Sequence, residues 1–276
     1  MTGNFTVQSV SVAAGKNSLH GKVWKGGPQL LLAFHGFSNS SSIFSGLARV
    51  LQPHFTTLAL DLPGHGSTDW PEKETLGYED LRRIVTHICA EYGVEKLSLL
   101  GFSLGGRVAL STLRAVPEKI RSATLLAPDG LRTHPVLAYA NGSRAGNFVL
   151  DDLHKHPGRY EKLLTMLYRR KVLNDKLYQF FLYHLSQTSY NDMLRVSWKA
   201  LRELHPKPAQ LRQVLGKYPV PVHLLMGIQD PVIKLQNGEY FASLFPQNVT
   251  LHKVSKGHRL MVEDLYPAIA QTLVHP

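Results

Sequence analysis

The residues most able to do chemistry form the G-x-S-x-G motif at 101–105, in which the serine is Ser103. An apolar run at 96–100 predicts a strand before the motif, and the apolar spacing at 104–115 predicts a helix after it. A serine flanked by glycines between a strand and a helix occupies a tight, strained turn that pushes its hydroxyl out of the sheet. The first backbone amides of the helix would point at whatever is bound there. We therefore predict that Ser103 is a catalytic nucleophile.

A serine needs a base to remove its proton, and the base needs a third group to fix its tautomer. After this motif, the acid and then the base are expected further along the chain. Asp230 follows a predicted strand in the sequence G-x-x-D-P, and His258 follows the last predicted strand in a Gly-His loop. Asp129, at the end of the strand after Ser103, is the alternative acid. We favour Asp230, because its position after the penultimate strand orients a carboxylate well, and predict a triad of Ser103, Asp230 and His258.

Two fixed backbone amides are needed where negative charge develops on an attacked carbonyl oxygen, and together they form an oxyanion hole. The N–H of Leu104, the residue after the nucleophile, is the first candidate. The second is the N–H of Phe37, in a His-Gly-Phe loop after a predicted strand. We expect His35 and His65 to brace loops rather than to act as bases. No aspartate stands in place of Ser103, which argues against dehalogenase or epoxide-opening chemistry through an alkyl-enzyme ester.

Strand-like and helical segments alternate along most of the chain. This predicts an α/β fold with a mostly parallel, doubly wound sheet of eight strands flanked by helices. The first two strands, separated by a turn signal at 15–18, can pair as an antiparallel edge. The loops that carry the predicted triad would then open on one edge of the sheet. The predicted strands span residues 5–12, 19–24, 29–34, 55–60, 96–100, 120–127, 220–227 and 249–254.

The alternation stops at residues 131–214, where no strand-like run appears and the patterns are helical. We predict that 131–214 is a helical cap, or lid, inserted on the carboxyl side of the strands. The core domain then comprises 1–130 and 215–276. Aromatic residues recur in the predicted cap and suggest an apolar cavity for an acyl or aryl group. They are Tyr160, Tyr168, Phe180, Phe181 and Tyr183.

The net charge of +11 is concentrated in the predicted cap, since residues 131–213 hold 14 Lys/Arg and six Asp/Glu. These cations could draw an anionic small-molecule substrate towards the site, or they could be the solvated faces of cap helices. No nucleic-acid reader motif accompanies them, so we expect no nucleic-acid partner. The basic residues considered are Arg132, Arg144, Arg169, Arg170, Lys171 and Arg195.

Bulk features favour a cytoplasmic enzyme. The single cysteine, Cys89, cannot form an internal disulfide and falls in a helical pattern, so we expect it to be buried. No apolar run approaches the ~18 residues of a membrane span. The residues at 1–5 show no secretory signal, and we interpret the one close histidine pair, His154 and His156, as solvated surface rather than as a zinc site. The oligomeric state stays open.

Together these pieces resemble the α/β-hydrolase fold serine hydrolases, from about residue 5 to 274. The matching parts are His35-Gly36-Phe37, the D-L-P-G-H-G-S run at 61–67, the motif at 101–105, Asp230 and His258. The resemblance implies that Ser103 attacks a carbonyl carbon, and that His258 takes the serine proton and returns it to the leaving group. It also implies that Asp230 stabilises the imidazolium, that water releases the acyl group, and that no cofactor takes part. The first interpretation is that the substrate is a carboxylic ester or thioester.

A narrower resemblance joins the S-L-G-G-R run at 103–107 and the H-G-F-S run at 35–38 to the menaquinone-pathway SHCHC synthase. That resemblance implies a carbon–carbon lyase or hydrolase reaction, with Arg107 helping to hold a substrate carboxylate. A third reading is a non-catalytic ligand-binding member of the fold, which the complete triad pattern argues against. Turnover of an ester panel would separate the first two interpretations, and metabolite binding without turnover would point to the third.

Overall fold

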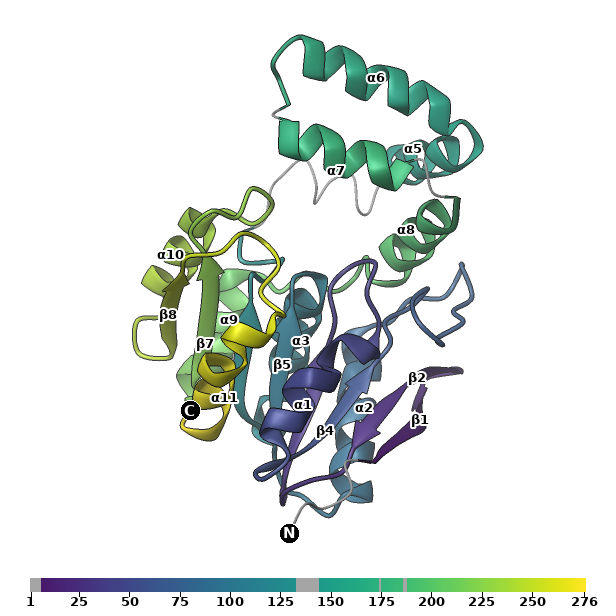
Figure 1. The fold of residues 1–276 in the computed structure, drawn as a ribbon. Helices are drawn as coiled ribbons and strands as arrows, with labels where there is room; N and C mark the ends of the chain where they lie inside the picture. Colours follow the sequence, from purple (N-terminus) through teal and green to yellow (C-terminus); the bar gives the residue numbers. More distant parts are fainter. Residues whose placement is uncertain (1–5, 133–143, 174, 186–187) are drawn as a thin grey trace.

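The computed structural model describes residues 6–132, 144–173, 175–185 and 188–276. Its centre is an eight-stranded sheet in the order β1-β2-β4-β3-β5-β6-β7-β8 (Figure 1). Strands β3 to β8 run parallel, whereas β2 is antiparallel to both β1 and β4. The predicted sheet and its antiparallel edge are confirmed. The strands are β1 Val7–Ala14, β2 Asn17–Trp24, β3 Gln29–Phe34, β4 Phe55–Leu60, β5 Leu97–Phe102, β6 Ile120–Leu126, β7 Val222–Gly227 and β8 Val249–Val254.

Both faces of the sheet are covered, which explains why its central strands are continuous apolar runs. In β3, Leu30 and Leu32 belong to the core on one face, and Leu31 and Ala33 to the core on the other. The first core includes residues of α2 (Tyr78–Glu91), α3 (Leu104–Ala115), α9 (Pro208–Lys217) and α10 (Leu235–Leu244). The second includes residues of α1 (Ser45–Leu51) and α11 (Tyr266–Val274). Short 3-10 turns lie at Ser41–Phe44, Pro117–Lys119 and Glu263–Leu265.

Among the described residues, four further helices lie beyond the carboxyl ends of the parallel strands, in the upper part of Figure 1, and we call them the upper helices. They are α5 (Arg144–Lys155), α6 (Pro157–Arg169), α7 (Asp175–Leu185) and α8 (Thr188–Ala200). No strand occurs in the described part of 131–214. The next helix, α9, contacts α3 and buries Leu211 and Leu215 in the core below, so the domain boundary predicted at 214 falls inside a helix.

An ion cluster attaches the upper helices to the segment between β4 and α2. The ammonium of Lys199, on α8, lies 2.6 Å from a carboxylate oxygen of Glu72 and 2.9 Å from one of Asp151 on α5. Arg195, also on α8, lies 3.0 Å from the other Glu72 oxygen. Because Glu72 belongs to the segment between β4 and α2, these charges fix α5 and α8 against the sheet domain.

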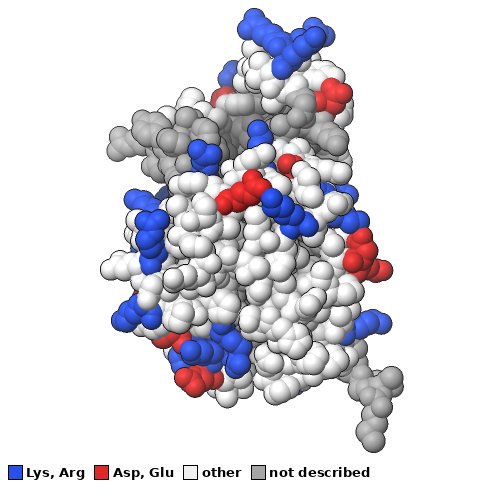
Figure 2. All heavy atoms as spheres, turned by 90° about the vertical axis from the view of Figure 1, so that its left-hand side faces the viewer, with Lys and Arg blue, Asp and Glu red and all other residues white. Residues whose placement is uncertain are grey.

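On the face that Figure 2 shows, Lys and Arg gather at the tip of the upper helices, and further Lys and Arg lie on the sheet domain below with a few Asp and Glu among them. Within the described ranges, none of the helices combines the length and the apolar character needed to cross a membrane.

Candidate active site

Ser103 occupies a strained turn between β5 and α3. Its φ of 51° and ψ of −115° are unusual for a residue with a side chain, and such backbone conformations cost on the order of 1–3 kcal/mol. Close packing around the turn explains the flanking glycines, because a Cβ on Gly105 would come within 2.0 Å of the carbonyl oxygen of Phe34. The N–H of Ser103 donates to the carbonyl of Leu126 at 2.9 Å. The strand-turn-helix context predicted for the motif is therefore present.

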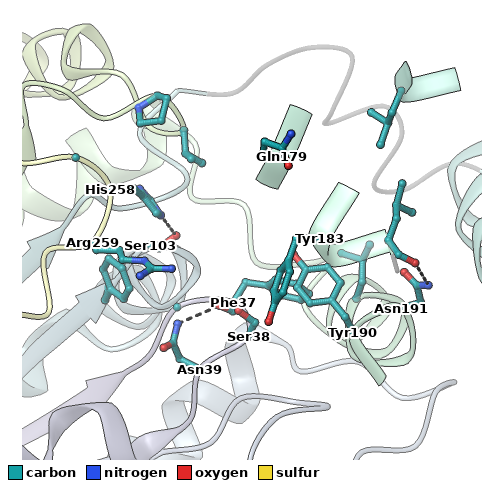
Figure 3. Close-up of a pocket in the computed structure, with 18 of the residues that line it drawn as sticks. Phe37, Ser38, Asn39, Ser103, Gln179, Tyr183, Tyr190, Asn191, His258 and Arg259 are labelled. Atoms are coloured by element: carbon teal, nitrogen blue, oxygen red, sulfur yellow. Dashed lines mark hydrogen bonds between the residues drawn. The ribbon is translucent and has the colours of Figure 1, made fainter. Parts of the chain in front are cut away.

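The structure brings Ser103, His258 and Asp230 together at the carboxyl edge of the sheet. The Nε2 atom of His258 lies 3.0 Å from Oγ of Ser103, and its Nδ1 atom lies 2.7 Å from Oδ2 of Asp230 (Figure 3 draws the Ser103 contact). A carboxylate can only accept, so Nδ1 carries the proton and Nε2 is free to accept the serine hydroxyl proton. The Asp230 side chain is fully buried, and its Oδ1 accepts the N–H groups of Val232 at 2.7 Å and Ile233 at 2.9 Å.

Asp129, the alternative acid, lies at a different place. Its side chain accepts the N–H of Gly130 at 2.7 Å and lies 3.5 Å from Nε of Arg107. Its backbone N–H donates to the carbonyl of Ser103 at 2.9 Å. Asp129 thus supports the strained turn through its backbone, and the acid beside His258 is Asp230.

The loop that carries Phe37 lies directly against the turn. A Cβ on Gly36 would come within 2.9 Å of the Phe102 ring and 3.3 Å of Cβ of Ser103, so only glycine fits there without displacement. Leu104 begins α3, and the first amides of a helix have no acceptor within it. The structure therefore places both residues predicted for the oxyanion hole next to Ser103.

Two buried histidines hold this loop, as predicted. The Nδ1 atom of His35 donates to the carbonyl of Gly36 at 2.7 Å, and its Nε2 accepts the N–H of Leu62 at 3.0 Å. Burial, helped by the neighbouring His65, lowers the pKa of His35 to about 3. The Nε2 atom of His65 accepts the N–H of Ser38 at 3.2 Å, and burial lowers the pKa of its ring. Both rings are neutral at pH 7 and tie the loop after β3 to the loop after β4.

Ser103 and His258 open into a cavity of about 1300 Å³ between the sheet domain and the upper helices. Its walls are mainly apolar, with leucines of the upper helices facing residues that follow the strands. Of the aromatic residues predicted to form a cavity, Tyr160 and Tyr183 line it. Tyr168 instead stacks on Tyr178, with ring centroids 4.2 Å apart. The side chains of Phe180 and Phe181 lie outside the described residues. The leucines are Leu153, Leu163, Leu164, Leu167, Leu185 and Leu194.

Arg107 lies outside the walls of this cavity. Its side chain is 11% exposed and lies 3.5 Å from a carboxylate oxygen of Asp129, so its predicted role in holding a substrate carboxylate stays a prediction. The basic residues singled out in the predicted cap also lie elsewhere: Arg195 belongs to the ion cluster with Glu72, and Arg132 lies over the ring of Tyr240. Arg169, Arg170 and Lys171 do not line the cavity, and the side chain of Arg144 is outside the described residues.

Sequence reasoning missed many residues of the cavity wall, among them Tyr190, Gln229 and Arg259. The Tyr190 ring meets Phe37 edge-on with centroids 4.7 Å apart, and burial raises the pKa of its phenol. Nothing in a helical pattern marks such a residue as facing a cavity. Arg259 and Gln229 could have been found, because each is a chain neighbour of a predicted triad residue.

The comparisons with known proteins agree with this architecture. The model of the alpha/beta hydrolase fold family matches residues 29–264. A pimeloyl-[acyl-carrier protein] methyl ester esterase of Neisseria meningitidis serogroup A is 27% identical over 245 residues, which are 83% of this chain and 68% of that protein. The structure of a thermophilic esterase from Thermogutta terrifontis has a TM-score of 0.68 at 18% identity and covers 97% of this chain and 98% of its own.

The narrower resemblance also has a counterpart among the relatives. A 2-succinyl-6-hydroxy-2,4-cyclohexadiene-1-carboxylate synthase of an Enterobacter species is 35% identical over 94 residues. That match covers 33% of this chain and 35% of the relative, whereas the family model spans most of the chain. The predicted family resemblance is confirmed: this chain belongs to the alpha/beta hydrolase fold family.

Proposed function

We propose that this protein is a serine hydrolase that cleaves a carboxylic ester or thioester through an acyl-enzyme intermediate. The observation that carries the proposal is the chain of contacts from Asp230 through His258 to Ser103, opening into an apolar cavity. Family membership and the relatives named as esterases support the hydrolase class.

In the proposed first step, His258 accepts the hydroxyl proton of Ser103 as Oγ attacks the carbonyl carbon of the substrate. The imidazolium that forms is stabilised by the buried carboxylate of Asp230 and then donates its proton to the leaving oxygen or sulfur. Water, deprotonated in turn by His258, attacks the acyl-enzyme and releases the acid. The hydrogen bond from Nδ1 to Asp230 keeps Nε2 available in both steps.

We assign the oxyanion hole to the N–H groups of Phe37 and Leu104. The neutral rings of His35 and His65 hold the Phe37 loop in place, so little reorganisation is needed as charge develops on the substrate oxygen. Edge-on packing of Tyr190 against Phe37 adds support from α8.

We also propose that 131–214 acts as a cap over a core of 1–130 and 215–276, because the upper helices supply much of the cavity wall. An aliphatic or aromatic group fits walls of leucine and tyrosine. The carbon–carbon lyase alternative required Arg107 to hold a carboxylate, and its side chain lies outside the cavity. A carbon–carbon hydrolase would use the same triad, so turnover of esters against vinylogous diketones separates these two reactions.

The decisive experiment is labelling with a fluorophosphonate probe beside turnover of p-nitrophenyl esters of increasing acyl length. We expect stoichiometric labelling of the unchanged protein, and Ser103→Ala should abolish labelling and lower kcat by at least about 10³-fold. Ser38→Ala is the matched control, because Ser38 also lines the cavity and also has a positive φ, 59°. It should retain labelling. A folded, unlabelled wild-type protein would rule out the proposed mechanism.

A further inference from the structure

Among the described residues, the wall of the cavity beside the triad has one arginine and no lysine. That arginine is Arg259, and the same described wall has no aspartate or glutamate. Figure 3 shows Arg259 on the side of the cavity that holds Ser103 and His258, across from Tyr183 and Tyr190. A single positive charge among largely apolar walls marks a place for one negative group of a ligand.

Two carboxylates of the segments around the site, those of Asp230 and Asp264, have partners other than Arg259. The carboxylate of Asp230 is fully buried and is occupied by His258 and two backbone N–H groups. The side chain of Asp264 pairs with Lys256 at 2.5 Å. Within the described part of the chain, the exposed guanidinium of Arg259 has neither an ion pair nor a hydrogen bond. Its charge is therefore directed to solvent or to a bound molecule.

The position of Arg259 in the chain limits where that negative group can be. It directly follows His258, and consecutive Cα atoms lie about 3.8 Å apart, so its charge is tethered beside the base. A scissile carbonyl must lie at Oγ of Ser103, which is 3.0 Å from the same imidazole. A carboxylate paired with Arg259 would thus lie within about one arginine side-chain length of the loop that carries the base, in the same cavity as the scissile carbonyl. The planar, always charged guanidinium suits a carboxylate.

We propose that Arg259 selects substrates whose acyl group carries a carboxylate, that is, half-esters or half-thioesters of dicarboxylic acids. This inference rests on the proposed serine hydrolase function and adds the substrate class to it. In this proposal the positive charge for an anionic substrate comes from one arginine of the sheet domain rather than from the basic residues of the cap. The remaining, largely apolar volume of the cavity would take the alcohol or thiol portion of the substrate.

The test compares kcat/KM for monoethyl adipate with kcat/KM for its neutral counterpart, diethyl adipate. Because Arg259 is exposed, the gain is moderate: we expect Arg259→Gln to lower the anionic-to-neutral ratio about five-fold. Arg259→Glu should lower it further, and added salt should weaken the wild-type preference. Arg132→Gln is the matched control, since Arg132 lies over Tyr240 and outside the cavity wall. An unchanged ratio in both Arg259 variants would overturn the proposal.

A binding measurement makes this test independent of turnover. In protein carrying Ser103→Ala, monoethyl adipate can bind without being cleaved, and calorimetry should show weaker binding when Arg259→Gln is added. Equal affinity in the two proteins, or no detectable binding in either, would exclude a carboxylate site at Arg259. Failure of the hydrolase proposal would look different, because fluorophosphonate labelling and hydrolysis of both esters would then be absent while this binding comparison still gave its own answer.

Discussion

At the scale of single residues, the hydrogen bonds of Asp230 determine which tautomer His258 adopts. Oδ1 of Asp230 accepts two backbone N–H groups, from Val232 and Ile233, and Oδ2 accepts the Nδ1–H of the imidazole. Every partner of this carboxylate is therefore a donor. An amide of the same shape cannot satisfy them all, because one of its two heavy atoms is itself a donor.

We predict that Asp230→Asn lowers kcat by on the order of 10³–10⁴-fold with little loss of fold. The amide oxygen would remain with the two backbone donors, which turns the NH₂ group towards His258. Nδ1 must then accept, so the proton moves to Nε2 and the imidazole can no longer take the hydroxyl proton of Ser103. Steady-state ester hydrolysis measures kcat, and a thermal melt measures whether the fold keeps its stability. Asp129→Asn is the control, and a larger loss of kcat in that variant would contradict the assignment of Asp230.

The placement of Ser103, Asp230 and His258 could be predicted because each follows a parallel strand, and such strands end at one edge of the sheet. The direction of a single side chain could not be predicted in the same way. Arg107 follows the motif closely in sequence, but its orientation depends on Asp129, which comes from the end of another strand. Arg259 is adjacent to His258, yet that it lines the cavity without an ion pair among the described residues is seen only in the folded structure.

At the scale of elements, apolar runs revealed the strands but not their order. The parallel strands have apolar side chains on both faces, so periodicity could not show that β4 lies between β2 and β3. No local sequence pattern predicted how the upper helices attach to the sheet domain. It depends on Glu72, between β4 and α2, meeting Lys199 and Asp151 from two separate helices.

We predict that Lys199→Met destabilises the protein by about 1 kcal/mol, in the range of partly exposed ion pairs. Lys199 is 13% exposed, and its loss leaves Glu72 and Asp151 close together with only Arg195 to offset them. A double-mutant cycle with Glu72→Gln, followed by urea unfolding, measures the coupling. Lys162→Met, at an exposed position on α6, is the matched control. Additive effects of the Lys199 and Glu72 changes would show that the cluster does not tie α8 to the sheet domain.

At the scale of the whole molecule, several histidines are buried or half-buried as neutral rings. Burial lowers the pKa of His35, His65, His205, His223 and His252, with neighbouring cations contributing at some of them. His223 and His252 join β7 to β8. Nδ1 of His223 lies 3.0 Å from Nε2 of His252, so one ring donates a hydrogen bond and the other accepts it. Protonating both rings would break this bond and place two positive charges side by side.

The free energy of unfolding should therefore fall on acidification. Unfolded histidines have a pKa near 6.5, whereas these folded histidines have a lower pKa, so below about pH 6.5 the unfolded chain binds more protons. Stability should be fully present above that pH and should decrease as pH falls, with the His35 contribution continuing to about pH 3. Urea unfolding at pH 8, 7, 6 and 5 measures the slope. His252→Asn should make the free energy of unfolding depend less on pH, because it removes one of these rings and changes the surroundings of His223. His275→Asn, at an exposed position, is the control. A free energy of unfolding that stays constant from pH 8 to pH 5 would mean that the histidines do not destabilise the fold when they gain protons.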